Sequence, residues 1–254
     1  MWRRLSDEER DRGKREFAGV IEEYSKGRFP KNRDCDEQEQ SDAINRKPHS
    51  QDQPKSPIRP SGITTPEAPI MVYTYSTFGL RADSDFMIWR IGYSLEGFQE
   101  MSSKIVNTAL GKYLHNTWSF LSMTKHSTYV DKHFHEGQEG RRARIVPSQS
   151  RYMFVYPFVK TTDWYLLPME DRQRMMDEHI QLGHKYPSVK INTSYSFGLD
   201  DQEFIVAFET DKPEDFMEVV MGMREQEGRK YTLRDTPIFT CVKKDIGEIL
   251  DMVA

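Results

Sequence analysis

The sequence contains a diverged internal repeat, and this repeat constrains the fold more than any other feature. The segment Trp2–Tyr24 aligns without a gap with Trp164–Tyr186. The identical aligned pairs include Trp2 with Trp164, Leu5 with Leu167, Glu8 with Glu170, Arg10 with Arg172 and Glu16 with Glu178. At one informative position the two copies differ, because Phe17 aligns with His179. The first copy has a ring that can only pack, whereas the second has a ring that can bind a metal.

The repeat continues beyond these helices, which argues against chance similarity. The turn sequence Tyr75–Leu80 is echoed by Tyr195–Leu199. After each turn, the pattern predicts a strand, a helix and a last strand. In the first half these are a strand at 85–89, a helix from Leu95 and a strand at 117–124. In the second half they are a strand at 203–208, a helix from Pro213 and a strand at 236–242. This order fits an α+β fold of two tandem ferredoxin-like repeats, with helices covering one face of an antiparallel sheet.

The predicted domain organisation is one structural domain built from two repeats, residues 1–125 and 151–244. The strand Arg151–Lys160 precedes the second copy, but only Met1 precedes Trp2, so we expect either a truncated start or a missing edge strand. Residues 25–69 are rich in Pro, Ser and charged residues and are predicted to be a disordered insertion, with a partner-binding segment as the alternative. Residues 126–150 are predicted as a connector and 245–254 as a C-terminal tail.

Composition indicates the broad class of protein. A net charge of −4 with 30% charged residues argues against a nucleic-acid-binding domain, which would carry a basic stripe. No apolar run approaches the roughly 20 residues of a membrane span, and no export signal is evident. The two cysteines, Cys35 and Cys241, form no metal-binding pattern. We therefore expect a cytoplasmic protein.

His179 is the candidate metal ligand. The helix predicted from Pro168 to Tyr186 carries Met175, His179 and Leu182 at helical spacing, so the histidine faces the same way as apolar residues. A histidine on such a face is more often a hydrogen-bonded core residue than a ligand. The counterpart Phe17 favours the ligand, because a core position could have kept phenylalanine. Imidazole is a common axial ligand of haem iron, and methionine-rich surroundings suit a porphyrin.

Several runs in the second half carry a resemblance to a known family. They are Tyr156–Lys160, Asp163–Pro168, Met175–His179, Gly183, Lys185–Tyr186 and Gly198–Asp201. Together they resemble the chlorite dismutase family, and within it the coproheme decarboxylase branch. The resemblance is specific over residues 152–240 and weaker over 2–24 and 73–129. It implies duplicated ferredoxin-like repeats that form a β-barrel with helices outside, homo-oligomers that are commonly pentamers, and haem held in the C-terminal repeat.

Residue by residue, the resemblance implies the roles of a porphyrin site. His179 matches the proximal iron ligand, and Tyr156 matches the tyrosine whose radical attacks the propionates in decarboxylases. Lys160 matches a propionate-contacting lysine, and strand alternation places it on the same face as Tyr156. Trp164 matches a tryptophan near the haem. Arg224 matches an arginine with a propionate role, although a solvated helix arginine is an equally good interpretation.

The chain departs from the family pattern on the distal side. Chlorite dismutases place an arginine where this chain has Ile191, and an apolar side chain there cannot stabilise an anionic oxychlorine ligand. Many decarboxylases have a glutamine near that position and an arginine at the position of His184. Asn192 could substitute after a shift of one residue, but on a strand it would point to the opposite face.

Three functions therefore compete. The first is conversion of Fe-coproporphyrin III to haem b by decarboxylation driven by hydrogen peroxide. The second is another haem oxidoreductase, either a peroxidase or a chlorite dismutase. The third is a non-enzymatic haem-binding or sensing protein, favoured by the missing distal polar group. A separate metal site is a weak alternative, at His126, Asp131, His133, His135 and Glu136.

Overall fold

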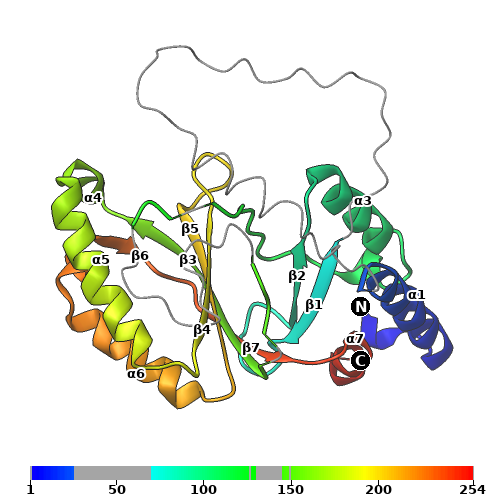
Figure 1. Cartoon of the computed structure of the whole chain (residues 1–254). Coiled ribbons are helices and arrows are strands. Elements are labelled where there is room, and N and C mark those ends of the chain that lie inside the picture. Colours follow the sequence, from blue (N-terminus) through cyan, green and yellow to red (C-terminus); the bar gives the residue numbers. More distant parts are fainter. Residues whose placement is uncertain (1, 26–69, 126, 130–144, 149, 254) are drawn as a thin grey trace, which may run out of the picture.

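The computed structural model describes residues 2–25, 70–125, 127–129, 145–148 and 150–253 (Figure 1). The first half contains η1 (Trp2–Arg4), α1 (Asp7–Ser25), β1 (Met71–Ser76), β2 (Phe86–Ile91), α3 (Leu95–Val106) and η2 (Gly111–Tyr113). The second half contains β3 (Tyr152–Lys160), α4 (Thr162–Leu166), α5 (Met169–His184), β4 (Lys190–Tyr195), β5 (Phe204–Thr210), α6 (Pro213–Glu225), η3 (Glu227–Tyr231), β6 (Thr232–Arg234), β7 (Phe239–Lys243) and α7 (Ile246–Val253). The insertion 26–69 and most of the predicted connector lie outside the described residues.

The strands form one curled antiparallel sheet with helices on its outer side. Its order is β2-β1-β7-β3-β5-β4, and the short β6 pairs with the end of β3. Figure 1 shows α4, α5 and α6 against the second-half strands and α1, α3 and α7 against the first-half strands. The sheet is therefore a half-barrel, and the predicted α+β architecture with helices outside is confirmed.

The duplication is visible in the turns that follow β1 and β4. Gly79 (φ 74°) and Gly198 (φ 69°) both adopt the left-handed conformation that favours glycine. In the first turn the Thr77 amide donates to the Asp85 carbonyl at 2.9 Å, and in the second the Ser196 amide donates to the Glu203 carbonyl at 2.8 Å. Matching turns at matching sequence positions support two copies of one unit.

The strand predicted at 117–124 is wrong. This segment makes a single bridge, in which Met123 and Tyr195 exchange two backbone hydrogen bonds of 2.8 Å. Beside the bridge, the Leu121 amide donates to the Asp200 carboxylate at 2.8 Å, and its carbonyl accepts from the Ser196 hydroxyl. Because side chains of the β4–β5 turn take these backbone groups, no continuous ladder forms with β4.

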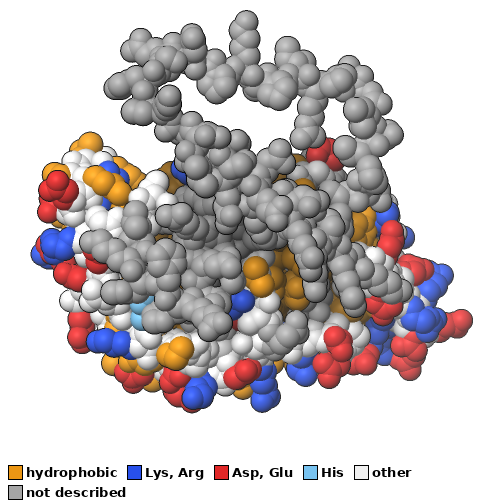
Figure 2. Space-filling model, viewed as in Figure 1, with side chains coloured by type: hydrophobic (Ala, Val, Ile, Leu, Met, Phe, Trp, Pro, Cys, Tyr) orange, Lys and Arg blue, Asp and Glu red, His pale blue; other side chains and the backbone are white. Residues whose placement is uncertain are grey.

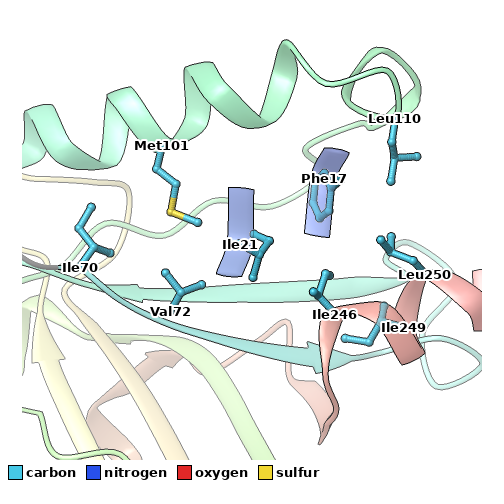
Figure 3. Close-up of a cluster of buried hydrophobic side chains, with 9 residues drawn as sticks. All are labelled: Phe17, Ile21, Ile70, Val72, Met101, Leu110, Ile246, Ile249 and Leu250. Carbon is cyan, nitrogen blue, oxygen red and sulfur yellow. The ribbon is translucent and has the colours of Figure 1, made fainter. Parts of the chain in front are cut away.

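The last residues differ from the predicted tail, because 246–253 form α7. This helix buries Ile246, Ile249 and Leu250 in the first-half core, where they pack with residues of α1, β1 and α3 (Figure 3). Phe17 of α1 is fully buried in the same cluster. The first copy of the repeat therefore uses its ring for packing, and the exact boundaries of the two repeats stay a prediction.

Two further clusters lie on opposite faces of the second-half sheet. The inner cluster includes Met153, Val155 and Cys241, and the outer cluster, under α5 and α6, includes Phe154, Tyr156 and Phe208. Acidic and basic side chains are interspersed on the visible face of the molecule (Figure 2). Within the described part of the chain, no helix is both long and apolar enough to span a bilayer.

Candidate functional site

The outward face of β3 carries Tyr156, which is buried between the sheet and the helices. Its ring stacks on Phe208 with centroids 5.9 Å apart, and its exposed fraction is 8%. No hydrogen bond joins its hydroxyl to another described residue. Burial, with the nearby Asp235 carboxylate as a second cause, raises the pKa of Tyr156 well above its usual value, so the phenol keeps its proton at neutral pH.

Lys160 lies at the end of the same strand and on the same face. Its Nζ is 4.0 Å from the centroid of the Trp164 ring and 3.5 Å from the Gly228 carbonyl oxygen. Its backbone amide donates to the Glu203 carboxylate at 2.7 Å. Burial lowers the pKa of Lys160 to about 8, although Glu203 opposes the shift. At neutral pH the ammonium is therefore mostly charged but poorly solvated, a state that an incoming carboxylate would stabilise.

Trp164 of α4 forms the base beneath this ammonium. It is 2% exposed and contacts the ring of Tyr231, with centroids 5.7 Å apart, and that of Tyr129, at 6.2 Å. The aromatic packing fixes the indole, so that its face is presented to Lys160 as a cation–π partner. Trp164 thus positions the lysine that the sequence predicted beside the cofactor.

His179 lies on the inner side of α5, one turn after the buried Met175. Pro168 and the acidic residues Glu170 and Asp171 at the start of α5 satisfy the preferences of a helix N-terminus. Burial and the charge of Lys160 lower the pKa of His179 to about 4. Its imidazole makes no hydrogen bond with any residue that the structure describes, unlike a typical core histidine. A neutral imidazole with one free nitrogen lone pair is suited to metal ligation.

A cluster of charged residues lies next to Tyr156. Arg224, in the last turn of α6, and Arg229, in η3, both contact the same carboxylate oxygen of Asp235, at 2.9 and 2.6 Å. The positive charges of both guanidinium groups lower the pKa of Tyr156 and so oppose the effect of Asp235. The predicted residue Arg224 is therefore brought to the site. Arg229, in η3, and Asp235, between β6 and β7, were missed because no sequence motif includes them, and only proximity in the fold identifies them.

Ile191 of β4 lies on the same sheet face as Tyr156. It pairs with Phe208, which pairs in turn with Phe154 of β3. Its exposed fraction is 42%, so this apolar side chain does not fill a closed core. As predicted, Asn192 points to the other face, where its amide donates to the buried Glu209 carboxylate at 2.7 Å. Asn192 therefore does not supply a polar group beside Ile191.

These residues fit an iron porphyrin better than a metal ion held by protein ligands alone. Among the described residues no group of three or more His, Cys, Asp or Glu side chains is placed to hold a metal. A porphyrin supplies four nitrogen ligands itself and needs one axial imidazole, which His179 would provide. Apolar rings and the cations Lys160, Arg224 and Arg229 match its apolar body and its carboxylates. The alternative metal site at 126–136 is outside the described residues, except for 127–129.

One surface hollow is unrelated to this arrangement. It lies on the outer side of α5 and is lined by Met169, Glu170, Gln173, Arg174, Asp177, Glu178 and Gln181. Neither Tyr156 nor His179 lines it. Its lining includes none of the predicted site residues, so it is not preferred as the functional site.

Known proteins resemble this chain over most of its length. The family model described as chlorite dismutase matches residues 59–244. A coproheme decarboxylase from Mycolicibacterium smegmatis is 35% identical over 170 residues, which are 65% of this chain and 70% of that protein. A variant of chlorite dismutase from Candidatus Nitrospira defluvii superposes with a TM-score of 0.73 at 24% identity, over 99% of this chain and 89% of that one. The same enzyme in complex with imidazole gives a TM-score of 0.70 at 24% identity over the same shares.

The two solved structures confirm the fold of duplicated ferredoxin-like repeats. The family match covers most of the chain and includes both halves of the sheet. The chain therefore belongs to the chlorite dismutase family, whose members bind haem, and it is a haem-dependent enzyme.

Proposed function

We propose that the protein converts Fe-coproporphyrin III to haem b, with hydrogen peroxide as the oxidant. The observation that carries this proposal is the placement of Tyr156 beside the cations Arg224 and Arg229, on the sheet face that is covered by the helices, among them the helix that bears His179. A site for haem b alone has no need of a buried phenol at the carboxylates. The 35% identical coproheme decarboxylase supports the same substrate.

Each residue has a role that follows from its surroundings. His179 would hold the iron through one ring nitrogen, since its lowered pKa keeps the imidazole neutral down to acid pH. Lys160 would bind a propionate through a charge-assisted hydrogen bond, with Trp164 beneath the ammonium. Arg224 would bind a second carboxylate. Bound iron porphyrin supplies the oxidising equivalents from peroxide.

Tyr156 would act on the propionate itself. Its phenol stays protonated because of burial, so it loses a proton and an electron together and then takes a hydrogen atom from the propionate side chain. Each propionate group, –CH2–CH2–COO⁻, gives a vinyl group and carbon dioxide, with two electrons passing to peroxide. One peroxide and one proton are consumed per propionate and two water molecules are formed, so atoms and charge balance. Two such steps convert coproporphyrin to the haem b skeleton.

A second candidate, a haem-dependent enzyme of the same family that does not decarboxylate porphyrins, is favoured by one observation. Ile191 presents an apolar side chain on the sheet face that opposes His179, and Asn192 points away from it. A peroxidase would be expected to have a polar distal group to assist cleavage of peroxide. The same apolar residue disfavours chlorite as a substrate, because no cation at this position stabilises the anion.

The test is a spectral titration of the purified protein with haem b and with iron coproporphyrin III, followed by peroxide and mass analysis. The proposal expects tighter binding of iron coproporphyrin and a product that has lost two carboxyl groups. Binding of both porphyrins with no change of mass after peroxide would favour the second candidate. Dismutation of chlorite would be detected separately as oxygen release.

Assembly and location are part of the same proposal. We expect a homo-oligomer, a pentamer as the family resemblance implies, and a cytoplasmic location. Sedimentation equilibrium of the full chain would test the assembly, with a monomer at micromolar concentration contradicting it.

A further inference from the structure

The short helix η3 is the element that connects all parts of the site. It packs against α4, α5 and α6. The Gly228 carbonyl in η3 accepts from the Lys160 ammonium at 3.5 Å. On the other side, a Cβ added at Gly228 would lie 3.9 Å from the Cβ of Met175, one turn before His179 on α5. The next residue, Arg229, is therefore held close to the lysine and to the helix that bears the iron ligand.

The orientation of Arg229 is fixed by Asp235. The carboxylate of Asp235 is largely buried, with 16% of the side chain exposed, and one of its oxygens contacts Arg229 and Arg224 together. Arg229 donates a hydrogen bond to this oxygen through one nitrogen and Arg224 forms an ion pair with it, and both guanidinium groups have further N–H donors. The two arginines keep 32% and 44% of their side chains exposed. Each guanidinium group is thus held by Asp235 and still has N–H donors that a bound carboxylate can reach.

The charges of this region match two carboxylates. Arg224, Arg229 and Asp235 together carry one net positive charge, and Lys160 carries another. The positive charge of Arg229 lowers the pKa of both Lys160 and Tyr156. A carboxylate placed at the Tyr156 hydroxyl would meet Asp235 as a repulsive neighbour unless a guanidinium lay between them.

We infer that Arg229 is a carboxylate-binding residue that gives the site its preference for a porphyrin with additional propionates, and that Asp235 is the positioning residue that aims Arg229 and Arg224. This inference rests on the proposed function and deepens it. Neither residue belongs to the sequence motifs of the site, and both are assigned from contacts alone.

The test uses metal-free porphyrins, because they cannot react and their fluorescence reports binding directly. Coproporphyrin III has four propionates and protoporphyrin IX has two, so the ratio of their dissociation constants measures recognition of the additional carboxylates. In Arg229→Gln we expect coproporphyrin binding to weaken about tenfold more than protoporphyrin binding, the size of one lost charge-assisted hydrogen bond. Arg229→Lys should restore part of the preference, because it restores the charge without the planar guanidinium.

Asp235→Asn tests positioning separately. This variant lacks one negative charge, so both porphyrins should bind more tightly. It also releases both arginines, so the preference for coproporphyrin over protoporphyrin, measured as the ratio of their dissociation constants, should fall. Arg174→Gln is the matched control. It removes a cation and the ion pair of Arg174 with Glu227 in η3, 2.8 Å long, on the outer side of α5. The ratio of the two dissociation constants in this variant should equal that of the wild type.

The outcomes separate the two proposals. If the wild type prefers coproporphyrin and both the Arg229→Gln and Asp235→Asn variants keep that preference in full, this inference is wrong and the proposed function stands. A wild type without any preference would overturn the proposed substrate and this inference together. The Arg174→Gln control can also contradict the inference. If it loses as much of the preference for coproporphyrin as Arg229→Gln does, the loss comes from a change in the fold of η3, and the role of Arg229 is overturned.

Discussion

Replacing His179 by phenylalanine, the residue at the equivalent position of the first copy, should stabilise the ligand-free protein at acid pH and abolish haem binding. Phe17 is fully buried in a packed core, so the repeat accepts a phenyl ring on this helix face. His179, in contrast, faces the site without a hydrogen-bond partner among the described residues, and its pKa is lowered to about 4. The histidine therefore lowers the free energy of unfolding at every pH at which its ring is protonated in the unfolded chain but not in the folded protein.

The sign and size follow from this shift. Between pH 6.5, its ordinary pKa, and about 4, the unfolded chain binds a proton that the folded protein does not, so stability rises with pH across this window. At about 1.4 kcal/mol per pH unit, the full difference is at most about 3.5 kcal/mol. The imidazole is only half-buried, so solvent screening reduces this to about 1 to 3 kcal/mol. Other groups titrate equally in both proteins and cancel in the difference.

The assay is urea denaturation of both ligand-free proteins at pH 7.5, 6, 5 and 4.5, with haem titration followed by the Soret band. We expect the advantage of His179→Phe over the wild type to increase steadily as the pH falls, and the variant to show no axial ligation. His179→Ala should also lose haem binding and show the same pH dependence, but its stability should be lower than that of His179→Phe at every pH because it lacks the ring. A constant stability difference across the pH range, or an unchanged Soret band in either variant, would refute the reasoning.

Three other predictions concern different parts of the molecule. With Ile191 on the distal face, chlorite should give negligible oxygen release at an oxygen electrode, and rapid sustained release would contradict the proposed function. Because the pKa of Lys160 is about 8, coproporphyrin affinity should fall as the pH rises above 8 in the wild type but not in Lys160→Met; parallel pH profiles in a fluorescence titration would exclude Lys160 as the carboxylate partner. Glu209→Ala should cost about 2 to 4 kcal/mol in urea denaturation, since it leaves Asn192 and the Ser148 amide without their acceptor; a loss below 1 kcal/mol would contradict this.

The fold could be predicted to the extent that the repeat determines it. Paired turns at Gly79 and Gly198 and apolar strand patterns in both halves gave the α+β architecture. The segment 117–124 has the composition of a strand, but hydrogen bonds from the β4–β5 turn replace its ladder, and sequence alone does not reveal such contacts. The helix α7 was missed because the repeat ends before it, although it completes the core around Phe17.

The site could be predicted where a motif or strand periodicity placed a residue. Tyr156 and Lys160 share a face because they are four residues apart on β3, and the alternation of β4 placed Ile191 and Asn192 on opposite faces. Arg229 and Asp235 could not be found in this way. They reach the site because η3 packs among three helices, a consequence of tertiary structure that has no local sequence signal.

The central claim is that Tyr156 is the residue that reacts with the propionates, and one comparison tests it most directly. Wild type and Tyr156→Phe, each loaded with iron coproporphyrin III, would be treated with measured equivalents of hydrogen peroxide and the porphyrin mass determined. The hydroxyl of Tyr156 has no hydrogen-bond partner among the described residues, so the variant should keep wild-type stability and porphyrin affinity. We predict loss of two carboxyl groups in the wild type and an unchanged porphyrin in the variant, whereas equal decarboxylation by both proteins would contradict the account.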